Sequence, residues 1–174
     1  AILNLSREEV EKVCAHGSQR GIVQTANLNS PGQIVISGEK IAVQYAMEVA
    51  KNLGARKAIE LNVSGAFHSP LMAPAKDGLS QIISKTNFNK AVVPVVANVD
   101  ASPTTDPEKI KRNLIEQLEN PVLWEDSVQR MLKEKITEFV EIGPGRVLQG
   151  LIKRIHREAT TSGIGTVEQL ESLS

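Results

Sequence analysis

The first 63 residues contain the pattern that most constrains the fold, two helical stripes that alternate with strand-like runs. Ser6 and Glu9 have the form of a capping box, and the apolar spacing after them predicts a helix up to Gly17. Apolar residues recur at helical spacing from Lys40 to Leu53, and Gly54 follows as a C-terminal cap. Strands are predicted before, between and after these helices. The order β-α-β-β-α-β is the split βαβ, or ferredoxin-like, arrangement, which is a complete small subdomain.

We expect the four strands of this arrangement at residues 1–5, 21–26, 33–37 and 56–63. The turn-forming cluster from Asn27 to Gly32 separates the second strand from the third. It predicts a hairpin whose loop is longer than a tight two-residue turn. The last strand is predicted from the alternation of Ile59, Leu61 and Val63 with other residues.

The second half of the chain predicts the order helix-strand-helix-helix-strand-helix. The apolar run Val92–Val99 is typical of a strand covered on both faces, and Phe139–Ile142 predicts a shorter strand. Two strands cannot form a buried parallel sheet, so this half is expected to need strands from elsewhere. The helices are expected at residues 71–86, 107–118, 121–135 and 146–157, with a short one at 167–173 in the tail.

Composition excludes several classes of protein. The 174 residues carry 20 basic and 20 acidic side chains, and this balance argues against nucleic-acid binding, which needs a basic surplus or stripe. Aromatic residues make up only 3%, so the core must be aliphatic. One cysteine, Cys14, rules out an internal disulfide and suits a reducing cytoplasm; its place on an apolar stripe predicts burial. No apolar run approaches the ~18 residues of a membrane span, and the N-terminus shows no signal-peptide pattern.

The segment Gly65–Met72 follows a predicted strand and precedes a predicted helix, which is where rigid elements hold reactive side chains. His68 is the best candidate there for acid–base chemistry, because histidine alone changes charge near neutral pH without perturbation. A lone loop histidine is more often structural, so this interpretation depends on its neighbours. A serine partner would sit in Gly-x-Ser-x-Gly, which the sequence lacks. His16 and His156 have no acidic or cysteine partner at ligand spacing, so no metal site is predicted.

Three further features each leave two interpretations open. Asn27 and Asn29 are either turn residues or amides aimed at a ligand carboxylate or carbonyl. The run Gly143–Gly145 at a helix start is either a plain turn or an anion site formed by backbone N–H groups. Lys153 and Arg154, on the last long helix, either complement the C-terminal helix dipole or dock an acidic partner.

Five blocks of the sequence stand out together: residues 27–38, 65–72, 95–100, 117–124 and 141–148. In this order they strongly resemble the bacterial malonyl-CoA:acyl carrier protein transacylases of fatty acid synthesis. The resemblance covers nearly the whole chain and corresponds to the C-terminal part of that family's sequence.

The resemblance implies an α/β-hydrolase-like core with an inserted ferredoxin-like subdomain. Residues 1–64 would form the subdomain, and residues 65–174 would form the C-terminal part of the core. It also implies that His68 is the catalytic base for a serine nucleophile. Gln117 matches the residue whose oxygen accepts a hydrogen bond from that imidazole, which fixes the tautomer where a triad would use Asp.

The resemblance also implies contacts with substrate. Asn27 and Asn29 match asparagines near the mouth of the active site. The tripeptide Ala66-Phe67-His68 is similar to the malonyl-type signature of related acyltransferase domains, in which a bulky Phe67 would crowd an α-methyl group and disfavour methylmalonyl.

The chemistry implied for the whole enzyme is ping-pong malonyl transfer from coenzyme A to the phosphopantetheine thiol of acyl carrier protein, with no bound cofactor. The nucleophilic serine, the N-terminal Gly/Gln motif of the oxyanion hole and the arginine for the malonyl carboxylate would lie in an N-terminal half that this sequence lacks. We therefore expect the 174 residues alone to be inactive. Lys153 and Arg154 would help to dock the carrier protein.

Two alternatives remain at the level of the sequence. The chain could be a non-catalytic ferredoxin-like interaction module with an appended α/β piece. It could also be an acyltransferase domain of a polyketide synthase, although the Ser/Gly-rich tail favours a stand-alone enzyme.

Overall fold

The computed structural model describes residues 1–172 and is an α/β protein. The chain divides into two compact units, Ala1–Ser127 and Val128–Ser174. This division differs from the sequence-based boundary between residues 64 and 65, which stays a prediction. Of the short helix expected at residues 167–173, residue 173 lies outside the described part.

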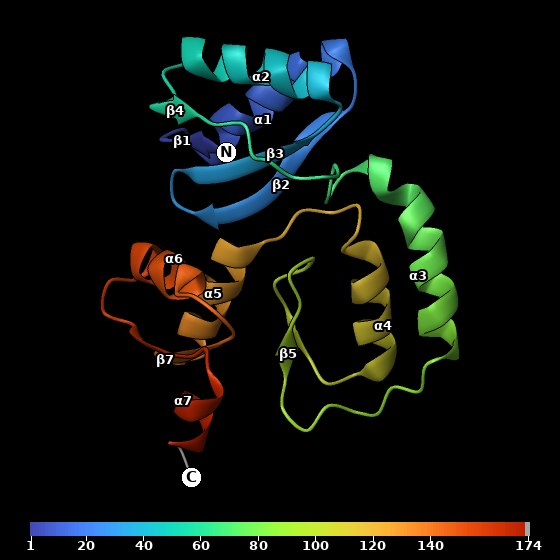
Figure 1. Ribbon diagram of the computed structural model, residues 1–174, viewed down its shortest axis with the longest axis vertical. Coiled ribbons are helices and arrows are strands. Elements are labelled where there is room, and N and C mark those ends of the chain that lie inside the picture. Colours follow the sequence, from blue (N-terminus) through green and yellow to red (C-terminus); the bar gives the residue numbers. More distant parts are fainter. Residues whose placement is uncertain (173–174) are drawn as a thin grey trace. The chain divides into compact units, whose positions relative to one another are not determined.

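The first unit opens with a four-stranded antiparallel sheet, in the strand order β2-β3-β1-β4, and two helices on one of its faces (Figure 1). The β-α-β-β-α-β element order predicted from the first 63 residues is confirmed. The elements are β1 (Ile2–Leu3), α1 (Arg7–Gly17), the 3-10 helix η1 (Ser18–Arg20), β2 (Val23–Ser30), β3 (Gln33–Gly38), α2 (Lys40–Asn52) and β4 (Lys57–Ala58).

The core of this sheet and its helices is aliphatic, as the composition predicted. The capping box at the start of α1 is present, because the Ser6 side chain accepts from the Glu9 N–H and the Glu9 carboxylate accepts from the Ser6 N–H. Gly54 follows α2 with a φ of 92°, the left-handed conformation expected after a helix. The buried core residues are Ile2, Leu5, Val10, Val13, Cys14, Val23, Leu28, Ile34, Ile36, Ala42, Ala46 and Ala50.

The hairpin between β2 and β3 corrects the sequence-based interpretation of the Asn27–Gly32 cluster. β2 runs on to Ser30, which pairs with Gln33, so the turn is the tight two-residue Pro31–Gly32. Gly32 has a φ of 68°, a conformation that glycine adopts without steric cost. Asn27 and Asn29 are therefore strand residues. Tertiary pairing with β3 overrides the turn preference of asparagine.

The fourth strand is shorter than predicted. Only Lys57–Ala58 pairs with β1, and residues 59–64 follow as irregular, largely exposed chain. The alternation of Ile59, Leu61 and Val63 does not mark a strand here, because each of these side chains is at least 43% exposed and has no buried face to fill.

The remainder of the first unit consists mainly of helices, of which α3 and α4 pack side by side (Figure 1). The Asp106 side chain caps α4 by accepting from the Glu108 N–H, and Pro107 stands in the first turn of the helix. The elements are the 3-10 helix η2 (Pro70–Met72), α3 (Ala73–Lys85), β5 (Val95–Val96), β6 (Pro103–Thr104), α4 (Pro107–Glu116) and α5 (Trp124–Lys133), which crosses into the second unit.

The prediction of a long buried strand at Val92–Val99 is wrong. Only Val95–Val96 is strand, paired antiparallel with β6, and the side chains of Val92 and Val93 are exposed. Apolar, β-branched composition creates a strand only where a partner strand satisfies its backbone groups, and here only two residues find one.

Besides the end of α5, the second unit contains a parallel pair of strands and the helices α6 (Val147–Ile155) and α7 (Val167–Glu171). The strands are β7 (Glu138–Ile142), close to the predicted position, and β8 (Thr160–Ile164), which the sequence analysis placed in an irregular tail. β8 was missed because its Thr, Ser and Gly residues lack an apolar alternation. The segment forms a strand because its backbone pairs with β7.

Candidate active site

His68 lies in the irregular segment between β4 and η2, as predicted. It adopts a φ of 60°, in the left-handed region that few non-glycine residues occupy, although histidine does so more often than most. Ser69 follows it, fully buried, with its hydroxyl donating to the Ala66 carbonyl at 2.6 Å and accepting from the Leu71 N–H. These bonds close a turn that holds the His68 backbone in this unusual conformation.

The imidazole of His68 contacts Gln117, at the C-terminal end of α4. Its Nδ1 lies 2.9 Å from the backbone oxygen of Gln117, and the His68 N–H donates to the Leu118 carbonyl at 3.1 Å. A carbonyl oxygen only accepts, so Nδ1 carries the proton and Nε2 is the basic nitrogen of the neutral ring. The Gln117 side-chain nitrogen lies 3.4 Å from Nδ1 and donates to the Asn120 carbonyl at 3.1 Å. The structure thus brings together the two residues that the sequence placed 49 positions apart.

Two contacts that the sequence analysis missed also join these segments. The side-chain amide of Gln24, on β2, donates to the backbone oxygens of His68 and Glu119. The Glu119 carboxylate forms an ion pair with Lys76 of α3, and this hydrogen bond raises the pKa of the Lys76 ammonium. Nothing in the sequence marks Gln24 or Lys76 as special, because their partners are remote backbone and side-chain groups.

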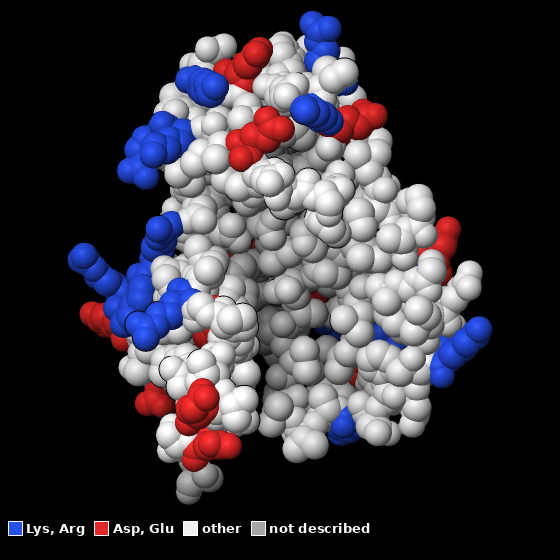
Figure 2. Space-filling view, in the orientation of Figure 1, with Lys and Arg blue, Asp and Glu red and all other residues white. Residues whose placement is uncertain are grey.

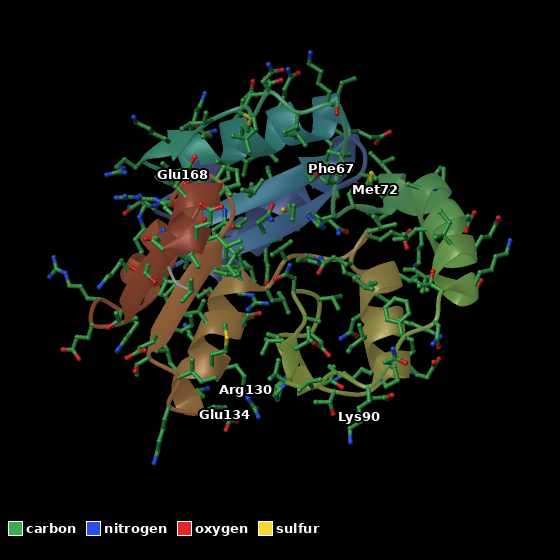
Figure 3. The ribbon with its side chains drawn as sticks, turned by 60° about the horizontal axis from the view of Figure 1, so that its bottom comes forward. Phe67, Met72, Lys90, Arg130, Glu134 and Glu168 are labelled. Atoms are coloured by element: carbon green, nitrogen blue, oxygen red, sulfur yellow. The ribbon has the colours of Figure 1, made fainter. Side chains whose placement is uncertain are left out.

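A pocket of about 790 Å³ lies beside His68. Phe67 lines it from the loop that precedes α3 (Figure 3), and its side chain is 47% exposed. Asn27 lines the pocket from β2, whereas Asn29 is not among the described residues that line it. Most of the other lining residues come from β3, α2 and residues 59–66, and they include Ile36, Lys40, Val43, Met47, Leu61 and Val63.

Asn27 and Asn29 share one face of β2, because Ala26, Leu28 and Ser30 between and beside them are buried on the other. Residue 27 also pairs with Val122 in a parallel bridge, with hydrogen bonds on both sides of it. The segment that follows Gln117 is therefore attached along β2.

The basic residues on α6 lie in the second unit. Lys153 and Arg154 are exposed and occupy the last turn of the helix, and blue atoms gather over α6 in Figure 2. The Lys153 ammonium donates to the Arg157 carbonyl at 3.4 Å, so it bonds an open carbonyl just beyond the helix end.

The start of α6 shows why the Gly143–Gly145 run favours the turn interpretation. The carboxylate of Glu141, on β7, accepts from the N–H groups of Leu148 and Gln149, each at 3.1 Å. Desolvation acts to raise the pKa of this carboxyl, but these backbone hydrogen bonds outweigh it and lower the pKa. The helix N-terminus is thus already occupied by an anion of the chain itself.

The described part of the chain holds no group of His, Cys, Asp and Glu side chains that could bind a metal ion. The His16 imidazole bonds the Lys12 carbonyl within α1 through its Nδ1, at 2.7 Å. No helix among the described residues is long and apolar enough to span a membrane.

An α/β protein in which a backbone carbonyl orients a histidine beside an open pocket has the features of a histidine-assisted transferase or hydrolase. The family model described as acyl transferase domain matches residues 4–170. The chain belongs to this family.

Particular relatives bear closely related names. The chain is 45% identical over 172 residues to a malonyl CoA-acyl carrier protein transacylase of Bacillus subtilis, a match that covers 98% of this chain and 54% of the relative. A crystal structure of an acyl carrier protein S-malonyltransferase from Vibrio cholerae matches with a TM-score of 0.94 at 41% identity, over 100% of this chain and 57% of that one. A malonyl-transacylase solved in complex with its type II PKS acyl carrier protein matches with a TM-score of 0.93 at 38% identity, over 98% of this chain and 55% of that one.

The chain spans about half the length of the curated relatives it matches. The resemblance read from the five sequence blocks is thereby confirmed at the level of the family.

Proposed function

We propose that this chain supplies the catalytic histidine of a malonyl transferase that moves malonyl from coenzyme A to the phosphopantetheine thiol of acyl carrier protein in fatty acid synthesis. The observation that carries the proposal is the 2.9 Å contact between His68 Nδ1 and the Gln117 backbone oxygen, beside a pocket large enough for part of a thioester substrate. The names of the relatives support the choice of acyl group and acceptor.

The nucleophile in this proposal is a serine that lies outside the present sequence, which contains no Gly-x-Ser-x-Gly motif. His68 Nε2 takes the proton from the serine hydroxyl as the serine oxygen attacks the thioester carbonyl. The carbon–sulfur bond then breaks, and the coenzyme A sulfur takes that proton from Nε2 and leaves as a thiol. The phosphopantetheine thiol then gives its proton to Nε2 and attacks the malonyl-serine ester, and the serine oxygen takes the proton back.

Gln117 acts in this scheme through its backbone oxygen. Nδ1–H donates to that oxygen, which keeps Nε2 unprotonated and stabilises the imidazolium that forms during each proton transfer. The carbonyl is a neutral dipole, so it orients the imidazole by a hydrogen bond alone. The carboxylate of a Ser-His-Asp triad does the same with a full negative charge.

Phe67, Asn27 and Asn29 are the substrate contacts in this proposal. Phe67 lines the pocket next to His68, where its ring would crowd an α-methyl substituent and so favour malonyl over methylmalonyl. Asn27 lines the same pocket, and Asn29 lies on the same face of β2 nearer the hairpin turn.

The architecture we assign to the whole protein is an α/β-hydrolase-like core with a ferredoxin-like insertion at residues 1–64, residues 65–174 being part of the core. The β2-β3-β1-β4 strand order supports the insertion. The parallel β7–β8 pair supports the core, because parallel strands normally belong to larger sheets covered on both faces. A reducing cytoplasm, predicted from the single cysteine, is where we place the reaction.

Lys153 and Arg154 dock the acidic carrier protein in this proposal. Both are exposed on the last turn of α6. Charge reversal at both positions should raise KM for the carrier protein and leave KM for malonyl-CoA unchanged. Lys133→Glu, which makes the same type of change at an exposed position on α5, is the matched control. Equal effects on both KM values would contradict docking.

The proposal is tested in a chimera, in which this chain replaces the matched segment of the Bacillus subtilis relative. The isolated chain should show no turnover of malonyl-CoA, and the chimera should transfer malonyl to acyl carrier protein. His68→Ala should lower the chimera's rate by at least about 10²- to 10⁴-fold. The control is His16→Ala, because the His16 ring is exposed on α1 and bonds only its own helix among the contacts described above.

Three outcomes contradict the proposal. Turnover by the isolated chain would show that no outside serine is needed. A folded chimera without activity would remove the transferase assignment. An active chimera that tolerates His68→Ala would indicate the interaction-module alternative, in which this part of the protein is not catalytic.

The polyketide alternative concerns only the acceptor, and one observation favours keeping it. A similar malonyl-transacylase was solved with a type II PKS acyl carrier protein. Comparison of kcat/KM for fatty acid and polyketide carrier proteins decides between the two settings.

A further inference from the structure

Gln24 makes two hydrogen bonds that tie together the two segments of the candidate active site. Its Nε2 donates to the His68 backbone oxygen at 2.7 Å and to the Glu119 backbone oxygen at 2.8 Å. An amide nitrogen has two hydrogens, so this donor is fully used. The two acceptors lie 44 and 95 residues away along the chain, and one of them belongs to the candidate catalytic histidine itself.

The position of Gln24 on β2 gives these bonds a rigid origin. Gln24 pairs with Ser37 of β3 in the antiparallel sheet, and Val23 before it is buried in the core. The His68 segment, in contrast, has no strand or helix of its own until η2 begins at Pro70. A side chain anchored in a sheet therefore reaches out to a loop that lacks regular structure.

The bonds act on the geometry that the imidazole needs. His68 holds a positive φ, a strained conformation for a residue other than glycine, which persists only where surrounding contacts enforce it. The His68 carbonyl accepts from Gln24, while the His68 N–H donates to Leu118, so both backbone groups of this residue are fastened. Glu119, two residues beyond Gln117, is fastened by the same amide.

We propose that Gln24 is a positioning residue, which holds the His68 imidazole in register with the Gln117 carbonyl so that Nδ1 keeps its proton and Nε2 remains the base. Its importance for catalysis rests on the proposed function, whereas its hold on the tautomer of His68 does not. Gln24 touches no reacting atom and acts through the backbone of His68.

Removal of the donors should free the two carbonyls and loosen the register. Gln24→Met keeps the length of the side chain and removes both hydrogens. In the chimera it should lower kcat by about 10- to 100-fold, the effect of a small misplacement of a catalytic group, with KM for malonyl-CoA nearly unchanged. The control is Gln19→Met, since Gln19 is exposed on η1.

A spectroscopic measurement on this chain tests the positioning without any activity. With ¹⁵N-labelled histidine, the neutral His68 ring should show the Nδ1–H tautomer in the wild-type chain, and a mixture with the Nε2–H tautomer in Gln24→Met. His16 is an internal reference, because its Nδ1 bonds the Lys12 carbonyl of its own helix, α1, and not either of the segments that Gln24 joins. Its tautomer should not change.

Two results for Gln24→Met would overturn the proposal. In the first, Gln24→Met changes the His68 tautomer and kcat no more than the control Gln19→Met does. In the second, Gln24→Met lowers only the melting temperature. Gln24→Glu, which retains size and polarity but presents acceptors to two carbonyls, should shift the tautomer in the same direction. If neither variant keeps the wild-type circular dichroism, Gln24 serves the fold and the proposal fails. A tautomer shift together with a harmless His68→Ala would retain the positioning and refute the proposed function.

Discussion

The sharpest consequence of the site geometry concerns Gln117, where a mutation of the side chain should matter little. The atom that lies 2.9 Å from His68 Nδ1 is the backbone oxygen, which every residue type carries. Gln117→Ala removes only the side-chain amide, with its 3.1 Å bond to the Asn120 carbonyl and its 3.4 Å approach to Nδ1. Alanine is also a better helix former than glutamine, so the end of α4 should be retained.

The expected magnitude follows from these distances. The contact at 3.4 Å is too long to be a strong hydrogen bond, so the main loss is one bond to Asn120. A typical hydrogen bond contributes about 0.5–1.5 kcal/mol net. If all of that loss were expressed in the transition state, the rate would fall by about 2- to 13-fold.

The assay is the initial rate of malonyl transfer in the chimera, followed by the mass of the carrier protein. Gln117→Ala is compared with His68→Ala, which removes the base and should cost at least about 10²- to 10⁴-fold. The ¹⁵N spectrum of His68 in Gln117→Ala should still show the Nδ1–H tautomer. A backbone-acting change at the same position, Gln117→Pro, provides the opposite extreme, since proline disturbs the carbonyl geometry at a helix end.

A fall of more than 100-fold in Gln117→Ala, with the helix intact, would refute this reasoning. It would mean that the side-chain amide, and not the backbone oxygen, orients the imidazole. A change of the His68 tautomer in the same variant would lead to the same conclusion without reference to catalysis.

Three further predictions concern stability and reactivity. Gly17→Ala should lower the free energy of unfolding by about 1–3 kcal/mol in urea denaturation, because its Cβ would lie 2.7 Å from Val23 Cγ1 and 2.9 Å from Ala46 Cβ. The matched Gly78→Ala, in α3 with no neighbouring atom within 4 Å, should instead stabilise by about 0.5–1 kcal/mol; the same sign for both would contradict the close packing of α1 on α2. Glu141→Gln should lower the melting temperature at pH 7. The pKa of this carboxyl is lowered in the folded chain. Its contribution to the free energy of unfolding is therefore present above the ordinary glutamate pKa of about 4.3 and is lost as the pH falls through the lower folded value. A difference in melting temperature that does not shrink on acidification would count against the helix cap. Burial raises the pKa of Cys14 to about 11, so at pH 8 Ellman's reagent should modify the folded chain far more slowly than the urea-unfolded chain, and equal rates would show that the thiol is accessible.

The β-α-β-β-α-β order of the first helices and strands could be predicted because most of its signals are local. The capping box at Ser6, the apolar stripe of α2 and the left-handed Gly54 depend only on neighbours within a few residues. The strands between these helices follow from β-branched residues in short runs. A chain with these local preferences, in this order, has few ways to bury its apolar faces other than the sheet observed.

The predictions that failed depend on partners that are remote in the sequence. Val92–Val99 has strand composition, but only Val95–Val96 finds a partner. Thr160–Ile164 lacks the apolar alternation that marks a strand, and it becomes one because it pairs with β7. Strand formation is decided by hydrogen-bond pairing, which a single sequence does not reveal.

The candidate site shows the same division. The sequence by itself determined that His68 occupies a loop between regular elements and, through its resemblance to known acyltransferases, which residue to pair with it. Only the tertiary structure decided that the pairing uses the backbone oxygen of Gln117, and that Gln24 fastens both segments. Backbone oxygens are the same in every residue, so an interaction between them and a distant side chain leaves no trace in the order of amino acids.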